Sequence, residues 1–87
     1  MNTVTIYTRP FCGFCSRAMQ LLREKGAPIE EIDAGMDPEK RAEMRDKSGG
    51  RNTFPQVFIN GEHVGGCDDL FALDKKGGLD ALLKESA

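Results

Sequence analysis

The chain has 87 residues, a formal net charge of −2 and 30% charged residues. A chain of this length forms one domain with one modest hydrophobic core. It has no basic stripe for nucleic acid, and no apolar run reaches the roughly 18 residues of a membrane span. The first residues lead directly into a strand pattern, so we expect no signal peptide and a cytoplasmic location. We therefore expect one domain over residues 1–87, with neither nucleic-acid nor membrane partners.

The first third of the sequence predicts a strand, a helix and a second strand. Val4 and Ile6 alternate with other residues, as in a half-buried strand. Apolar residues then recur at helical spacing, and Gly26 followed by Pro28 ends that helix. The predicted elements are a strand over Thr3–Tyr7, a helix over Cys15–Lys25 and a strand over Pro28–Asp33.

The rest of the sequence predicts a helix, a hairpin and two short helices. Asp37 followed by Pro38 is typical of a helix start, and Asn60-Gly61 is typical of a tight hairpin turn. Acidic residues after Cys67 favour another helix start. The predicted elements are a helix from Asp37 to Ser48, strands Gln56–Ile59 and Glu62–Val64, a helix from Cys67 that Gly77-Gly78 interrupts, and a helix over Leu79–Lys84.

Two of the three cysteines lie between the first strand and the first helix. Cys12 and Cys15 are three residues apart, which predicts a pair on the first turn of the helix. There, free backbone N–H groups and the helix dipole favour an anion, so we expect Cys12 to be held largely as thiolate. The second thiol is then close enough to attack a mixed disulfide on the first. The pattern therefore predicts a redox site.

This order of elements, with Cys-x-x-Cys at the first strand–helix turn, predicts an α/β fold of the thioredoxin-like type. The first two strands are expected to run parallel, connected by the helix, and the hairpin adds antiparallel pairing. The predicted domain is thus a four-stranded mixed sheet flanked by helices.

Three separated motifs make the chain resemble the small dithiol glutaredoxins. They are Thr8-Arg9-Pro10-Phe11-Cys12-Gly13-Phe14-Cys15, then Thr53-Phe54-Pro55, then Gly65-Gly66-Cys67-Asp68-Asp69. The resemblance implies an enzyme that reduces protein–glutathione mixed disulfides and protein disulfides, with glutathione as cosubstrate. It implies that Cys12 is the nucleophile and Cys15 the resolving thiol. We expect glutathione and glutathionylated or disulfide-containing proteins as partners.

The resemblance also implies a groove for glutathione, whose two carboxylates and one amine need polar partners. Arg9 can pair with the glycyl carboxylate, while the helix start near Cys67 offers N–H groups to the γ-glutamyl carboxylate. A cis bond before Pro55 would leave the backbone of Phe54 free to pair with the ligand. The predicted glutathione contacts are Arg9, Phe14, Thr53, Phe54, Pro55, Gly66, Cys67, Asp68 and Asp69.

The sequence departs from the usual patterns of this family in three places. Tyr7-Thr8-Arg9-Pro10-Phe11 leaves no room for the extra residues that the monothiol branch carries before its site. Dithiol members usually have Cys-Pro-Tyr-Cys, whereas Gly13-Phe14 is the pair of the monothiol branch that handles iron–sulfur clusters. Phe54 stands where a smaller β-branched residue is usual. The alternative function is therefore a [2Fe–2S] cluster held by Cys12 and glutathione in a dimer. Without a cluster we expect a monomer and no metal.

A zinc site is a third alternative, formed by Cys12, Cys15, His63 and Cys67. The gap between the two pairs is far longer than in usual zinc sites, which disfavours it. His63 is expected to face solvent from a hairpin strand. Cys67 is expected to pack as a small apolar residue, although its thiol lies near a helix start.

Overall fold

Four strands form one mixed sheet in the order β2-β1-β3-β4 in the computed structural model, which describes residues 3–84. β1 (Val4–Thr8) and β2 (Ile29–Asp33) run parallel, and α1 (Gly13–Glu24) connects them. β3 (Gln56–Ile59) pairs antiparallel with β1 and with β4 (Glu62–Gly65). The predicted four-stranded mixed sheet is confirmed. The ends of the predicted domain, residues 1–2 and 85–87, lie outside the described residues.

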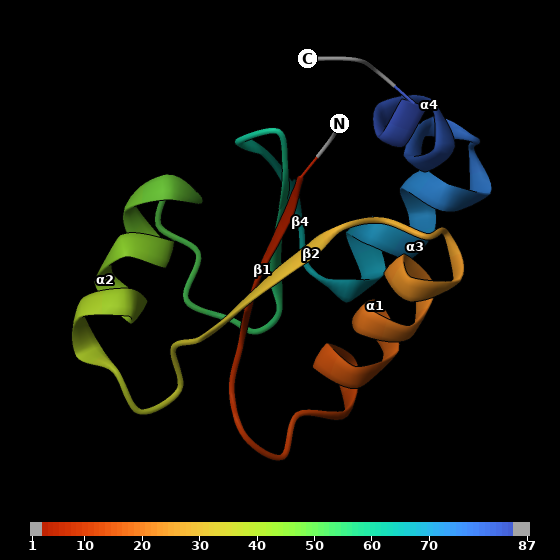
Figure 1. Cartoon of the computed structure of the whole chain (residues 1–87). Coiled ribbons are helices and arrows are strands. Elements are labelled where there is room, and N and C mark those ends of the chain that lie inside the picture. The colour runs from red at the N-terminus through yellow and green to blue at the C-terminus, as the bar shows by residue number, and fades with distance from the viewer. Residues whose placement is uncertain (1–2, 85–87) are drawn as a thin grey trace.

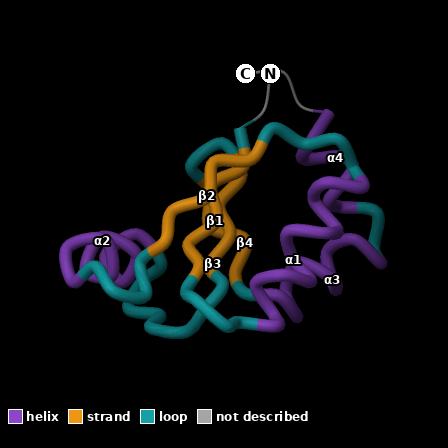
Figure 2. The backbone as a smooth tube through the Cα atoms, turned by 60° about the horizontal axis from the view of Figure 1, so that its bottom comes forward, coloured by secondary structure: helices purple, strands orange, loops and turns teal. Residues whose placement is uncertain are grey.

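Helices cover both faces of the sheet. α1, α3 (Cys67–Lys75) and α4 (Gly78–Lys84) lie on one side, and α2 (Pro38–Lys47) lies on the other (Figures 1 and 2). The Asp37 side chain caps α2 by accepting hydrogen bonds from the N–H groups of Glu39 and Lys40, as the sequence predicted. No helix of residues 3–84 has the length and apolar character to cross a bilayer.

The sheet separates two hydrophobic clusters because strand side chains alternate between its faces. Val4 and Ile6 of β1 face the larger cluster with α1 and α3, whereas Tyr7 faces a smaller cluster under α2. Met44 is the buried apolar residue of α2 in that smaller cluster. The Tyr7 hydroxyl donates a 2.6 Å hydrogen bond to Glu43, which fixes α2 further to the sheet.

The last helices are fixed to α1 by a shared cation. Lys25, at the end of α1, lies 2.9 Å from the carboxylate of Asp74 and 3.1 Å from that of Asp80. Leu79 of α4 is fully buried, while Leu82 and Leu83 are half-buried against the larger cluster. This packing holds α1 in place, and α1 carries the two cysteines at its start.

Candidate active site

Cys12 lies at the end of the loop after β1, directly before α1. It is the N-cap residue of that helix, with extended backbone angles, and its sulfur accepts a hydrogen bond from the N–H of Cys15 at 3.2 Å. The prediction placed both cysteines on the first helical turn. The structure instead places Cys12 just before the helix and Cys15 at its third position. The N–H donor and the helix N-terminus both favour negative charge on the Cys12 sulfur.

The loop before Cys12 has an unusual backbone shape. Phe11 has a φ of 57°, a value in the left-handed region that bulky residues rarely adopt. Its side chain is fully exposed, so no packing in this chain accounts for it. Gly35 passes close to the same loop, and a Cβ at this position would lie 2.7 Å from Arg9 Cβ and from Pro10 Cδ. A glycine at 35 therefore allows the segment after β2 to contact the loop of the nucleophile.

Cys12 and Cys15 are both buried, with 8% and 5% of their surfaces exposed. Burial, and then the hydrogen bond with Cys12, raise the pKa of the Cys15 thiol to about 12. Arg9 opposes this shift through its backbone N–H and its charge. Cys15 is therefore a protonated thiol in the resting site. All three cysteines are free thiols in this structure.

The loop over residues 53–55 lies against Cys12. The peptide bond between Phe54 and Pro55 is cis, as the resemblance implied, and the Phe54 carbonyl oxygen lies 4.0 Å from the Cys12 sulfur. The buried amide of Gln56 donates to the carbonyl and hydroxyl oxygens of Thr53, each at 3.0 Å. On the other side, Arg41 of α2 stacks over the Phe54 ring, 5.7 Å from its centroid. These contacts fix the loop beside the nucleophile.

The start of α3 forms the next wall. Gly65 has a φ of 126°, and a Cβ there would lie 2.7 Å from Asp69 Cβ, so both backbone shape and space require glycine. Asp69 accepts a 3.0 Å hydrogen bond from the Gly66 N–H and pairs with Arg51 at 3.4 Å. The Gly66 N–H, followed by Arg51, lowers the pKa of the Asp69 carboxyl. The neighbouring carboxylate of Asp68 is exposed and makes no such bond among the described residues.

Eight of the nine predicted glutathione contacts line one groove of about 300 Å³. Its lining residues are Phe14, Arg51, Thr53, Phe54, Pro55, Gly66, Cys67, Asp68 and Asp69. Arg51 is the added residue, and it is not one of the predicted glutathione contacts. The opposite charges of Arg51 and of the acidic first turn of α3 could have indicated that the two segments lie together.

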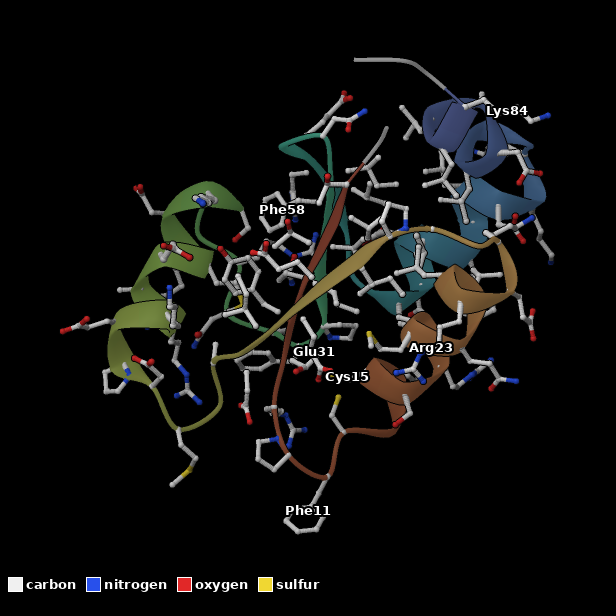
Figure 3. The ribbon with its side chains drawn as sticks, in the orientation of Figure 1. Phe11, Cys15, Arg23, Glu31, Phe58 and Lys84 are labelled. Carbon is white, nitrogen blue, oxygen red and sulfur yellow. The ribbon has the colours of Figure 1, made fainter. Side chains whose placement is uncertain are left out.

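Arg9, the ninth predicted contact, lies in a different pocket. This second pocket has a volume of about 430 Å³ and is lined by Arg9, both cysteines of the pair, Arg23 and Glu31, among others. In Figure 3, Cys15, Arg23 and Glu31 lie together between β2 and the start of α1. The structure thus places Cys12 between two hollows and does not bring Arg9 into the groove.

The structure also shows the surroundings of His63 and Cys67. His63 was expected to face solvent, and this is wrong: it is half-buried, its Nε2 lies 2.7 Å from Gln56 Oε1, and its ring contacts Phe58. Burial lowers its pKa. Cys67 packs in the larger hydrophobic cluster, as predicted, and burial raises its pKa. No three potential metal ligands come together among residues 3–84, so the zinc set does not form.

The sheet order and the surroundings of Cys12 define a class of protein. A thiol at a helix N-cap, with a protonated thiol beneath it and a cis-proline loop against it, can exchange disulfides in two steps. On a four-stranded mixed sheet with helices on both faces, this is a thioredoxin-fold thiol–disulfide oxidoreductase.

Comparisons with known proteins narrow this class. The family model named Glutaredoxin matches residues 4–64. Glutaredoxin 3 of Escherichia coli K12 is 51% identical over 84 residues, which cover 97% of this chain and 100% of that protein. The solution structure of a Brucella melitensis glutaredoxin is 62% identical with a TM-score of 0.81, covering 94% of this chain and 88% of that one.

A third comparison concerns a ligand. The crystal structure of the buckwheat glutaredoxin–glutathione complex is 30% identical with a TM-score of 0.83, and it covers 94% of this chain and 76% of that chain. The chain described here belongs to the glutaredoxin family. It is accordingly a glutathione-linked thiol–disulfide oxidoreductase.

Proposed function

We propose that this protein reduces protein–glutathione mixed disulfides and protein disulfides, and that Cys12 is its nucleophile. The observation that carries the proposal is the Cys15 N–H donated to the Cys12 sulfur, with the Cys15 thiol buried beneath it. Charge on Cys12 is stabilised by the backbone, while Cys15 keeps its proton. The two thiols are therefore prepared for different steps.

The chemistry with a mixed disulfide uses Cys12 alone. Its thiolate attacks the glutathione sulfur, a Cys12–glutathione disulfide forms, and the substrate thiolate leaves and takes up a proton. The thiolate of a second glutathione then attacks the glutathione sulfur held on Cys12. Oxidised glutathione leaves, and Cys12 is again a thiolate.

The chemistry with a protein disulfide also uses Cys15. Cys12 attacks one substrate sulfur, and the other substrate sulfur leaves as a thiolate that accepts a proton. Cys15 then loses its proton and attacks the Cys12 sulfur, which forms the Cys12–Cys15 disulfide and releases the second substrate thiolate. Two glutathione molecules reduce that disulfide and become oxidised glutathione.

The groove between the 53–55 loop and α3 is the proposed glutathione site. Its Phe54 carbonyl lies beside Cys12, where it can accept a hydrogen bond from the cysteinyl N–H of the ligand. The first-turn N–H groups of α3 favour the γ-glutamyl carboxylate. Asp69 is already bonded to Gly66 and Arg51, so we assign the ligand's amine to Asp68. The buckwheat complex supports glutathione as the ligand class.

The test is a glutathione-coupled assay on a glutathionylated peptide. The peptide should be released only when both the protein and reduced glutathione are present, and oxidised glutathione should appear in equal amount. Cys12→Ser should abolish this activity, whereas Cys15→Ser should retain it. Release at the rate of glutathione alone would contradict the proposal.

A second candidate function is [2Fe–2S] binding by a glutathione-bridged dimer, which Gly13 favours. Gly13 begins α1 beside Cys12, and a Cβ there would meet nothing within 4 Å. Its N–H, which a proline would lack, is a donor next to a ligating sulfur. One chain offers Cys12 as the cysteine at the helix N-cap, so glutathione and a second chain would complete the ligands. Such a cluster would supply electron-transfer or cluster-transfer chemistry.

We propose a cytoplasmic setting and a monomer in the absence of a cluster. Both thiols of the site must be reduced for activity, and reducing compartments keep them so.

A further inference from the structure

The second pocket, which we call the Arg23 pocket, lies on the β2 side of Cys12, whereas the groove lies on the β3 and α3 side. β1 stands between β2 and β3 in the sheet, and the two hollows share no lining residue. Cys15 lines the Arg23 pocket, as do Arg9, Arg23 and Glu31 (Figure 3). This pocket is therefore next to the thiol that acts only on protein disulfides.

The charges of the Arg23 pocket are unbalanced. The guanidinium groups of Arg9 and Arg23 make no ion pair and no hydrogen bond with another side chain of residues 3–84. The carboxylate of Glu31 accepts a 2.8 Å hydrogen bond from the Thr8 hydroxyl. Two unpaired cations and one bonded carboxylate give the pocket a net positive charge in a chain whose total charge is −2. A partner with carboxylates fits such a pocket.

The rim of the pocket offers apolar contact. Phe11 lines it, is fully exposed, and has the left-handed backbone described above. Strained backbone and exposed aromatic side chains occur together where a chain meets a partner. A protein partner crossing the pocket would cover this ring, which a small thiol would leave exposed.

We propose that the Arg23 pocket binds acidic side chains that flank the reactive cysteine of a protein disulfide substrate. This inference rests on the proposed function and names a substrate class for it. When Cys12 holds the substrate sulfur, Cys15 attacks from the pocket side and the substrate sulfur leaves toward the groove. An extended substrate chain that crosses Cys12 advances about 3.3 Å per residue, so residues two to four positions from its cysteine reach the pocket.

The test uses three peptides with the same intramolecular disulfide. Their flanking positions on both sides are all Glu, all Gln or all Lys, and kcat/KM for reduction is measured with the wild type, Arg23→Glu and Lys75→Glu. Lys75 is an exposed cation of α3 that lines neither hollow, so its variant changes the total charge equally. Turnover of a glutathione mixed disulfide with a small neutral thiol is measured alongside, to normalise each variant for its thiol chemistry.

We expect the wild type and Lys75→Glu to favour the Glu peptide over the Lys peptide by about fivefold, and Arg23→Glu to reverse this order. The preference should shrink as salt is raised. Equal rates on the three peptides, or the same reversal in Lys75→Glu, would overturn the inference and leave the glutathione-dependent function standing. Failure on both the peptides and the small mixed disulfide would overturn both.

Discussion

The backbone N–H of Cys15 donates a hydrogen bond to the sulfur of Cys12, the atom that the Cys15 thiol must later attack. One residue thus holds charge on the nucleophile and keeps the resolving thiol within reach. The two roles are compatible because they use different atoms of Cys15. Its N–H belongs to the start of α1, and its side chain faces the interior.

The first prediction concerns the pH dependence of Cys15. Its pKa is raised, so its thiol stays protonated to higher pH in the folded protein than in the unfolded chain, where thiols ionise near pH 9. We expect Cys15 to resist iodoacetamide up to about pH 10 in the native state and to react readily in denaturant. Mass spectrometry of timed alkylation measures this. Rapid native modification of Cys15 at pH 9 would contradict the burial argument.

The second prediction separates the two aspartates at the start of α3. Asp69→Ala should lower the free energy of unfolding by about 1 kcal/mol, because it removes the acceptor for the Gly66 N–H. Asp68→Ala, at an exposed position, should change it by less than about 0.5 kcal/mol and should raise KM for glutathione mixed disulfides. Urea denaturation and steady-state kinetics measure both effects.

The Asp69 effect should also depend on pH. Its carboxyl pKa is lowered in the fold, so its contribution is present above the unfolded value of about 3.8 and is lost as pH falls through the folded pKa. The difference in stability between wild type and Asp69→Ala should therefore shrink in acid. A constant difference from pH 7 to pH 2 would show that the charge of Asp69 is not involved.

The third prediction compares two arginines. Arg51 lines the groove, and Arg9 lines the pocket on the other side of Cys12. Arg51→Gln should therefore raise KM for a glutathione mixed disulfide more than Arg9→Gln does. The Arg51–Asp69 pair is exposed, so its loss should cost at most about 1 kcal/mol of stability. A larger increase in KM from Arg9→Gln than from Arg51→Gln would show that Arg9 contacts glutathione, and would contradict this assignment.

The fourth prediction concerns Gly13 and the iron–sulfur alternative. Proline suits the first position of a helix, and the space around Gly13 is open, so Gly13→Pro should fold normally. Anaerobic reconstitution with iron, sulfide and glutathione should give a coloured dimer for the wild type and a much weaker colour for Gly13→Pro. Colourless monomers in both cases would remove the cluster function.

Most of the fold could be predicted because its signals are local. Periodicity and the Gly26, Asp37 and Asn60-Gly61 signals give each element to within a few residues. The boundary of α1 was less accurate, since the helical repeat of apolar residues begins at Cys15 whereas the helix begins at Gly13. The helical pattern does not include residues that start a helix by capping it.

The second hydrophobic cluster could not be predicted in this way. α2 contributes one fully buried residue, Met44, so its sequence gives little sign of the face that it covers. Because α2 covers that face, Tyr7 and Phe58 are buried. His63 is half-buried through its contacts with Phe58 and Gln56, although its strand pattern predicts a solvent-facing residue. Arg9 and Arg51 lie on different sides of Cys12 because of the order of the strands in the sheet. A single sequence motif carries no information about that order.

The most direct measurement compares Cys12→Ser and Cys15→Ser on two substrates, a glutathionylated peptide and a peptide with an intramolecular disulfide. Cys12→Ser should abolish both activities, because burial raises the pKa values of the other two thiols, Cys15 and Cys67, and neither residue is a helix N-cap. Cys15→Ser should retain deglutathionylation and lose reduction of the intramolecular disulfide. Equal loss of both activities in the two variants would contradict the assignment of Cys12 as nucleophile and Cys15 as resolving thiol.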